Sequence, residues 1–179
     1  MPKDQAIAQN EPVEQACSRK NAVNRLLELI KNNDNKPLII KSKDGDEARL
    51  SKSSIGKLLS GVAVKKSITN GFTAEQHFAA ASYIDNLFGN SIKILTSPDR
   101  KGDPNIKAIH RFVAPLFRSN VAYITVKEAT EQGKRIYSVE LIEMGKLEGY
   151  WNEDASSIAT LGIASNPATS LPTNNNIEN

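Results

Sequence analysis

Two segments in the second half of the chain alternate apolar and polar side chains: VAYITVKE at residues 121–128 and KRIYSVELIEM at residues 134–144. An alternation with a period of two is typical of β-strands that bury one face and expose the other. ATEQG joins them, and a glycine-containing linker of about five residues predicts a β-hairpin. Because the apolar face of such a hairpin must be covered, the chain is restricted to folds in which a second layer packs on a sheet.

The segment FTAEQHFAAASYIDNLFG, residues 72–89, predicts the most clearly delimited helix of the chain. Thr73 and Gln76 have the spacing of a capping box, and Gly89 is suited to end the helix. Its apolar residues recur at helical spacing and form one stripe. They are Phe78, Ala81, Ile84, Leu87 and Phe88.

Two further helices are predicted nearer the N-terminus. SRKNAVNRLLELIKNN, residues 18–33, carries an apolar stripe at helical spacing, with Ser18 as its N-cap. SKSSIGKLLSG, residues 51–61, predicts a shorter helix that Ser51 caps and Gly61 ends.

Other short segments predict strands. NKPLIIKS and EARLS flank the turn Asp44-Gly45 and predict a hairpin, SIKILT predicts a single strand, and IKAIHRFVAPLF predicts a strand disturbed near Pro115. Helices therefore come first and a run of strands follows. This order predicts an α+β fold with the N-terminal helices packed on one face of an antiparallel sheet of roughly four strands.

The chain length and its composition predict a single domain with polar ends. A chain of 179 residues can bury one core but not two substantial ones. Residues 1–17 have little apolar periodicity and predict a flexible segment, and residues 18–151 predict the folded domain. Residues 152–179 are rich in Asn, Ser, Thr and Pro and predict a disordered tail.

Composition excludes several classes of protein. The net charge is only +3 and the cations are scattered, which is far from the concentrated charge of a dedicated DNA-binding module. The single cysteine, Cys17, excludes an internal disulfide framework and a multi-cysteine metal site. No apolar run approaches the roughly 20 residues of a membrane-spanning helix, and the N-terminus has no signal-peptide core. We expect a cytoplasmic protein without a membrane partner, with delivery into a host cell's cytoplasm as the alternative.

Alternation assigns the side chains of the hairpin at residues 121–144 to two faces. One face is apolar, and we expect it to lie beneath the helices. The opposite face is polar, which is ordinary for a two-layer sheet with one solvated side. The expected buried set is Ile124, Val126, Val139 and Leu141, and the expected polar set is Thr125, Lys127, Ser138 and Glu140.

The chain has only two histidines, and each has two interpretations. His110 lies in an apolar run, on the strand face opposite Arg111, as either a structural histidine or a general acid or base. His77 lies in the first turn of a predicted helix, as either a polar residue packed on Phe72 or a second proton carrier. Neither has the HxH or HExxH spacing of a metal site, so no metal is expected.

The polar face has the residue types that RNA cleavage without a metal requires. Threonine and serine can donate hydrogen bonds to phosphate oxygens, and lysine or arginine can stabilise a phosphorane. Histidine moves protons near neutral pH. The competing interpretation of the same residues is an ordinary solvated surface.

Four stretches carry a resemblance: EQHFAAASYIDNLF, DPNIKAIHRFVAPL, AYITVKE and GKRIYSVE. They resemble the large polyvalent protein-associated and MuF-type C-terminal domains of phages and conjugative elements. Some of these domains are assigned to the barnase–EndoU–colicin–RelE superfamily of metal-independent ribonucleases, whose fold is one or more helices followed by a four-stranded antiparallel sheet. Residue by residue, the resemblance implies catalytic roles for His110, His77, Lys127 and Arg111, and substrate-binding roles for Thr125, Ser138 and Tyr137.

The first functional hypothesis is therefore a phage or mobile-element ribonuclease-like domain, cleaving RNA by general acid/base catalysis without a cofactor. The alternative is a non-catalytic module of the same origin that binds a host protein through the polar sheet face. A small nucleic-acid-binding domain is disfavoured, because only 6% of residues are aromatic and could stack on bases. Strand alternation also places Tyr137 on the face opposite Ser138, so both line one site only if a bulge intervenes.

Overall fold

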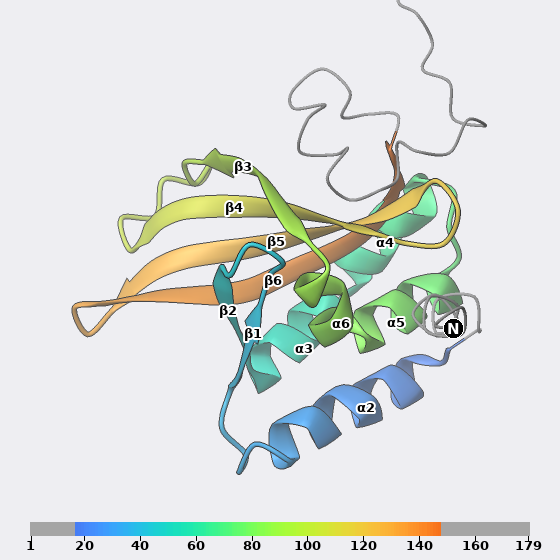
Figure 1. Ribbon diagram of the computed structural model, residues 1–179, viewed down its shortest axis with the longest axis horizontal. Helices are drawn as coiled ribbons and strands as arrows, with labels where there is room; N and C mark the ends of the chain where they lie inside the picture. Colours follow the sequence, from blue (N-terminus) through green and yellow to red (C-terminus); the bar gives the residue numbers. More distant parts are fainter. Residues whose placement is uncertain (1–16, 148–179) are drawn as a thin grey trace, which may run out of the picture.

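The computed structural model describes residues 17–147, and it has the predicted α+β architecture. The helices lie on one side of the sheet (Figure 1). Residues 1–16 and 148–179 lie outside the described part, so the predicted flexible segment, apart from Cys17, and the predicted C-terminal tail lie outside it as well. None of the described helices is long and apolar enough to cross a membrane.

Along the described residues, most helices precede the long strands. The helices are α2 (Arg19–Lys31), α3 (Lys52–Leu58), α4 (Gly61–Thr69), α5 (Ala74–Ser82) and α6 (Ile84–Gly89). The strands are β1 (Leu38–Lys41), β2 (Glu47–Leu50), β3 (Ile92–Ser97), β4 (Ile106–Pro115), β5 (Asn120–Glu131) and β6 (Lys134–Lys146).

Within the described residues the strands form one six-stranded sheet in the order β1-β2-β6-β5-β4-β3. The sheet is thus larger than the four strands expected, because the β1–β2 hairpin joins the edge of β6. That junction is the parallel pair Arg49↔Ser138, whereas the other neighbours are antiparallel. The sheet is therefore mixed and not purely antiparallel.

The predicted helix starts are confirmed by their caps. Ser18 accepts a hydrogen bond from the Asn21 amide, and Ser51 and Thr73 each form a capping box. The expected end of the second helix at Gly61 is wrong, because Gly61 is the first residue of α4, a helix that the sequence analysis did not predict.

The long helix expected over residues 72–89 is divided into α5 and α6 at Tyr83. Arg25 of α2 contacts all three residues around this break. Its guanidinium donates to the Ser82 carbonyl, pairs with Asp85 at 3.2 Å and lies 4.0 Å from the centre of the Tyr83 ring. The break lets α6 turn so that Ile84 and Phe88 enter the core, where Phe88 and Phe112 pack edge to face with ring centres 4.8 Å apart.

The β5–β6 connection is tighter than expected. A loop of about five residues was predicted, but the turn consists of Gln132 and Gly133 alone, with φ angles of 48° and 74°. Two successive positive φ values match the type I′ turn, whose twist suits a two-residue hairpin. Both strands consequently run further, and their ends extend well past the helices (Figure 1).

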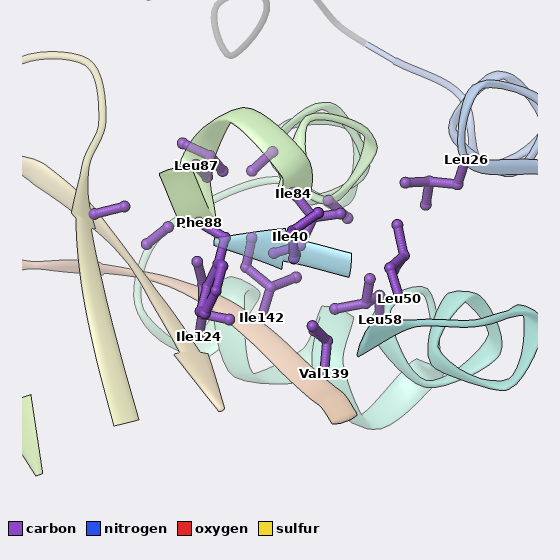
Figure 2. Packing of buried hydrophobic residues seen from close by; sticks show 14 of the residues in the cluster. Leu26, Ile40, Leu50, Leu58, Ile84, Leu87, Phe88, Ile124, Val139 and Ile142 are labelled. Carbon is purple, nitrogen blue, oxygen red and sulfur yellow. The ribbon is translucent and has the colours of Figure 1, made fainter. Parts of the chain in front are cut away.

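A β-bulge corrects one residue of the predicted core. Thr125 pairs with Leu141 and Val126 pairs with Val139, so Glu140 is an extra residue on β6. Beyond it the side-chain faces exchange, because a shift of one residue moves every following side chain to the other face. Ile124, Val126 and Val139 are buried as predicted, but Leu141 is only half-buried on the opposite face, and Ile142 takes its place in the core (Figure 2).

The turn of the β1–β2 hairpin reaches the far edge of the sheet. The Lys43 amide donates to the Ser91 carbonyl at 3.0 Å, and Lys93 of β3 pairs with Asp46 at 2.8 Å. Since β1 and β3 are the two edge strands, this turn passes across the helix-facing side of the sheet (Figure 1). The space beneath it is where the candidate site lies.

Candidate functional site

His110 and Glu128 form a buried pair on the helix-facing side of the sheet, beyond the helices. His110 Nε2 lies 2.7 Å from Glu128 Oε2, and their side chains are only 10% and 8% exposed. The β4–β5 register pairs His110 with Val126, so Glu128 is its diagonal neighbour on the same face. Alternation along the two strands thus fixes the pair.

Polar neighbours complete the group on both sides. Thr96 of β3 lies directly opposite His110, with its hydroxyl 2.9 Å from Nδ1 of the imidazole. Arg135 pairs with the other Glu128 oxygen at 3.2 Å, and the Tyr137 ring lies 5.9 Å from the His110 ring. The buried carboxylate of Glu128 therefore lies between an imidazole and a guanidinium, a position that offsets the cost of its desolvation.

His110 lines a pocket of about 310 Å³, within the size range of small-ligand sites. The floor comes from the sheet and the rim from the β1–β2 turn. Lys93 at the rim is held by Asp46, so cationic and anionic groups both face the space. Its lining residues are Gly45, Asp46, Glu47, Lys93, His110, Phe112, Val126 and Tyr137.

The partners of His110 are compatible with two protonation states. A carboxylate only accepts, so Nε2 carries a hydrogen and donates it to Glu128. The Thr96 hydroxyl can donate to an unprotonated Nδ1 or accept from a protonated one. His110 can therefore gain or lose a proton at Nδ1 without losing a hydrogen bond, which is what a general acid or base requires.

His77 occupies a different place, in the middle of the helical layer. Its side chain is fully buried, with Nε2 at 2.8 Å from the Leu58 carbonyl and Nδ1 at 2.8 Å from the Ser67 hydroxyl. Burial lowers the pKa of His77 from its ordinary value of 6.5. The neutral imidazole thus joins α3, α4 and α5 together.

The polar face opposite the helices holds four of the predicted site residues. Arg111 pairs with Glu143, which also pairs with Lys66 of α4. Lys127 pairs with Glu140, which also binds Lys57 of α3. Thr125 and Ser138 lie on this same face, in register with Arg111 and Lys127 respectively.

The comparisons with known proteins identify the family. The model of the family described as large polyvalent protein-associated domain 3 matches residues 18–137. The chain belongs to this family. Comparison with curated proteins and with solved structures gives no match.

Membership of the large polyvalent protein-associated domain 3 family confirms the polyvalent-protein part of the predicted resemblance and makes the chain a phage- and mobile-element-associated domain. It does not extend to the barnase–EndoU–colicin–RelE superfamily. The matched range contains His110, Glu128 and Arg135 and ends at Tyr137.

The seven predicted site residues of this polyvalent protein-associated domain lie in three places. His110 and Tyr137 are together at the pocket. His77 is in the helical layer, and the remaining four are on the opposite face: Arg111, Thr125, Lys127 and Ser138.

Sequence reasoning missed Glu128, Thr96 and Arg135. The signal for Glu128 was present, because it continues the alternation of Ile124 and Val126 and so places a carboxylate on the helix-facing side. The partnership of Thr96 with His110 depends on a register shift in β3 between Lys93 and Leu95, which no local pattern marks.

The described residues of the domain contain no group of three or more His, Cys, Asp or Glu side chains placed to hold a metal ion. Cys17 lies half-buried at the start of α2, where burial raises the pKa of its thiol. A raised thiol pKa reduces the thiolate fraction and disfavours a nucleophilic role.

Proposed function

We propose that this phage- and mobile-element-associated domain cleaves RNA by general acid/base catalysis at the His110–Glu128 pair. One observation carries the proposal: a buried carboxylate lies 2.7 Å from an imidazole that lines an open pocket. Acid/base sites commonly combine burial with a charged partner in a cleft in this way. The support is the geometry of the pair, and the family match adds only the phage and mobile-element setting.

The proposed reaction uses the two residues in opposite roles. Glu128 accepts the proton of the RNA 2′-hydroxyl as the 2′-oxygen attacks the adjacent phosphorus. The bond from phosphorus to the 5′-oxygen breaks, and that oxygen takes the proton carried by Nδ1 of protonated His110, directly or through the Thr96 hydroxyl 2.9 Å away. The products are a 2′,3′-cyclic phosphate and a free 5′-hydroxyl.

Cationic groups beside the pair would stabilise the phosphorane. Arg135 reaches Glu128 Oε1 while its side chain remains 70% exposed, so its guanidinium is also accessible to a substrate phosphate. Lys93 lies at the pocket rim, about one-third exposed. On the opposite face, Lys127 pairs with Glu140, and no histidine lies beside it to transfer a proton.

The test uses the purified full-length protein and a labelled single-stranded RNA. Wild-type protein should cleave the RNA to cyclic-phosphate products in the presence of EDTA and leave a DNA of the same sequence intact, because DNA lacks the 2′-hydroxyl. Loss of one acid or base typically lowers the rate by about 10²- to 10⁴-fold. The cleavage rates of His110→Ala and of Glu128→Gln should therefore each fall by at least about 100-fold.

Two control variants separate the possible sites. Lys127→Ala and Ser138→Ala alter the opposite face and should keep the wild-type rate. If these two abolish cleavage and His110→Ala does not, the site lies on that face instead. If folded wild-type protein in excess leaves RNA intact over hours, the domain is not a ribonuclease, and the host-protein binding hypothesis takes precedence.

A further inference from the structure

The segment of the sequence that contains α3 and α4 carries positively charged residues and no negatively charged ones. Between Glu47 and Glu75 the sequence has no acidic residue. The same stretch has five cations: Arg49, Lys52, Lys57, Lys65 and Lys66. Since the whole chain has a net charge of only +3, this stretch is the most asymmetric part of the described domain.

Helix α4 also exposes large aliphatic side chains. Only Ala63 and Ser67 of this helix are buried. Val62 is 67% exposed and Ile68 is 50% exposed, more than nearly all other large apolar residues of the described part. Val62, the more exposed of the two, precedes Lys65 and Lys66 by three and four residues, so an aliphatic side chain and two lysines share one face of α4.

A groove follows this helix on its β6 side. Its volume is about 360 Å³, enough for one or two aliphatic side chains. Val62, Lys65, Lys66 and Thr69 recur at helical spacing along one wall, and Asn70 and Glu143 complete the lining.

The groove is rigidly built. The Met144 amide donates to the Ser67 hydroxyl at 3.0 Å, and the Asn70 side chain donates to the Met144 carbonyl at 2.8 Å. These bonds fix α4 against β6, so a ligand would not have to order the helix before binding. Such preorganisation lowers the entropic cost of association.

The lysines of the region differ in their availability. Lys57 and Lys66 pair with Glu140 and Glu143. Lys52 and Lys65 are exposed and have no ion pair within the described part of the chain. Lys65 lies on the groove wall, and it is therefore placed to pair with an anionic group on whatever occupies the groove.

We propose that α4 is a docking surface for an acidic peptide segment of a partner protein. The segment places an aliphatic side chain in the groove beside Val62, and a carboxylate next to it pairs with Lys65, the exposed lysine on the groove wall. A nucleic acid fits less well, because its phosphates make no use of Val62 and none of the residues that line the groove is aromatic and able to stack on a base. The nine-residue helix offers too little apolar area for stable insertion into a lipid surface.

The test measures binding of a short synthetic peptide in which Asp and Glu residues flank two Leu residues at helical spacing. Binding to the full-length protein is followed by NMR chemical shifts and by fluorescence anisotropy. We expect the largest shifts at α4 and β6, and weaker binding as salt rises and screens the lysines. A matched peptide with both Leu changed to Asn should bind at least about tenfold more weakly.

Paired variants place the contact on α4. The double change Val62→Ser and Lys65→Glu should weaken binding at least about tenfold. The control is Leu27→Ser with Lys20→Glu on α2, where an exposed aliphatic residue and an exposed lysine are altered in the same way. The control variant should bind within about twofold of wild type.

Several results would overturn the proposal. They are equal loss in the α2 control, equal binding of the Asn peptide, or displacement of the peptide by single-stranded RNA or anionic vesicles at lower concentration. A self-association of the protein that disappears with Val62→Ser would assign the groove to a second copy of the chain. None of these outcomes depends on RNA cleavage, so the docking surface and the proposed ribonuclease site are tested separately.

Discussion

The two histidines of the chain are both buried and both bonded through each ring nitrogen, yet their surroundings differ in kind. His77 lies among helices and contacts a serine hydroxyl and a backbone carbonyl. His110 lies on the part of the sheet that extends past the helices, and it contacts a threonine hydroxyl and a carboxylate. His110 also lines the pocket beneath the β1–β2 turn.

The chemistry of the partners decides what each imidazole can do. The Leu58 carbonyl only accepts, so Nε2 of His77 carries the hydrogen. The Ser67 hydroxyl already accepts from the Met144 amide, and it donates its own hydrogen to Nδ1 of His77. Protonating His77 would leave that hydroxyl hydrogen without an acceptor in a buried place. His110 has no such restriction, because Thr96 is exposed and can reverse its role.

The largest change in stability should follow the removal of the His77 side chain. His77→Ala leaves a cavity in the helical layer and the Leu58 carbonyl without its donor, so unfolding free energy should fall by about 2–4 kcal/mol. Urea denaturation followed by circular dichroism measures the loss. The exposed neighbour gives the control, since Glu75→Gln should change stability by no more than about 0.5 kcal/mol. Equal stability of the two variants would show that His77 does not hold the helices together.

Removing the hydroxyl that contacts His77 should also destabilise the protein more than removing the hydroxyl that contacts His110, by a smaller amount than the loss of His77 itself. Ser67→Ala removes both the acceptor of the Met144 amide and the donor to His77, and should cost about 1–3 kcal/mol. Thr96→Val keeps the shape of an exposed residue and should cost no more than about 0.5 kcal/mol. Thermal unfolding of both variants tests the comparison. A Thr96→Val loss as large as that of Ser67→Ala would mean that both histidines are structural.

Much of the fold follows from local sequence signals. The caps at Ser18, Ser51 and Thr73 and the alternation in β5 and β6 act over a few residues, so the sequence was enough to place them. Helix α4 was missed because Gly61 was interpreted as a stop, although Ser60 caps the new helix by accepting from the Ala63 amide. A glycine between two helices is compatible with either role.

The candidate site needed information that no local pattern contains. The bulge at Glu140, which moves Leu141 out of the core, is visible only when β5 and β6 are paired. The rim of the pocket depends on the contact of Lys93, on the edge strand β3, with Asp46 in the β1–β2 turn, two residues far apart in the sequence. Alternation was enough to place Tyr137 opposite Ser138 and His110 opposite Arg111, but not to relate the two strands to each other.

The smallest expected effect is a pH dependence of stability that belongs to His77 alone. Burial lowers the pKa of the folded-state imidazole below 6.5, so between 6.5 and that lower pKa the unfolded chain binds a proton that the folded chain does not. Stability should therefore be unaffected by this group above pH 6.5 and should fall as pH decreases below it, by up to about 1.4 kcal/mol per pH unit.

In His77→Gln, the amide can donate to Leu58 and accept from Ser67 without titrating. The stability gap between wild type and this variant should consequently narrow toward acid pH, since His110 is present in both proteins and its contribution cancels. Urea midpoints measured from pH 7.5 to 5 provide the test, and parallel curves for the two proteins would contradict the buried neutral state assigned to His77.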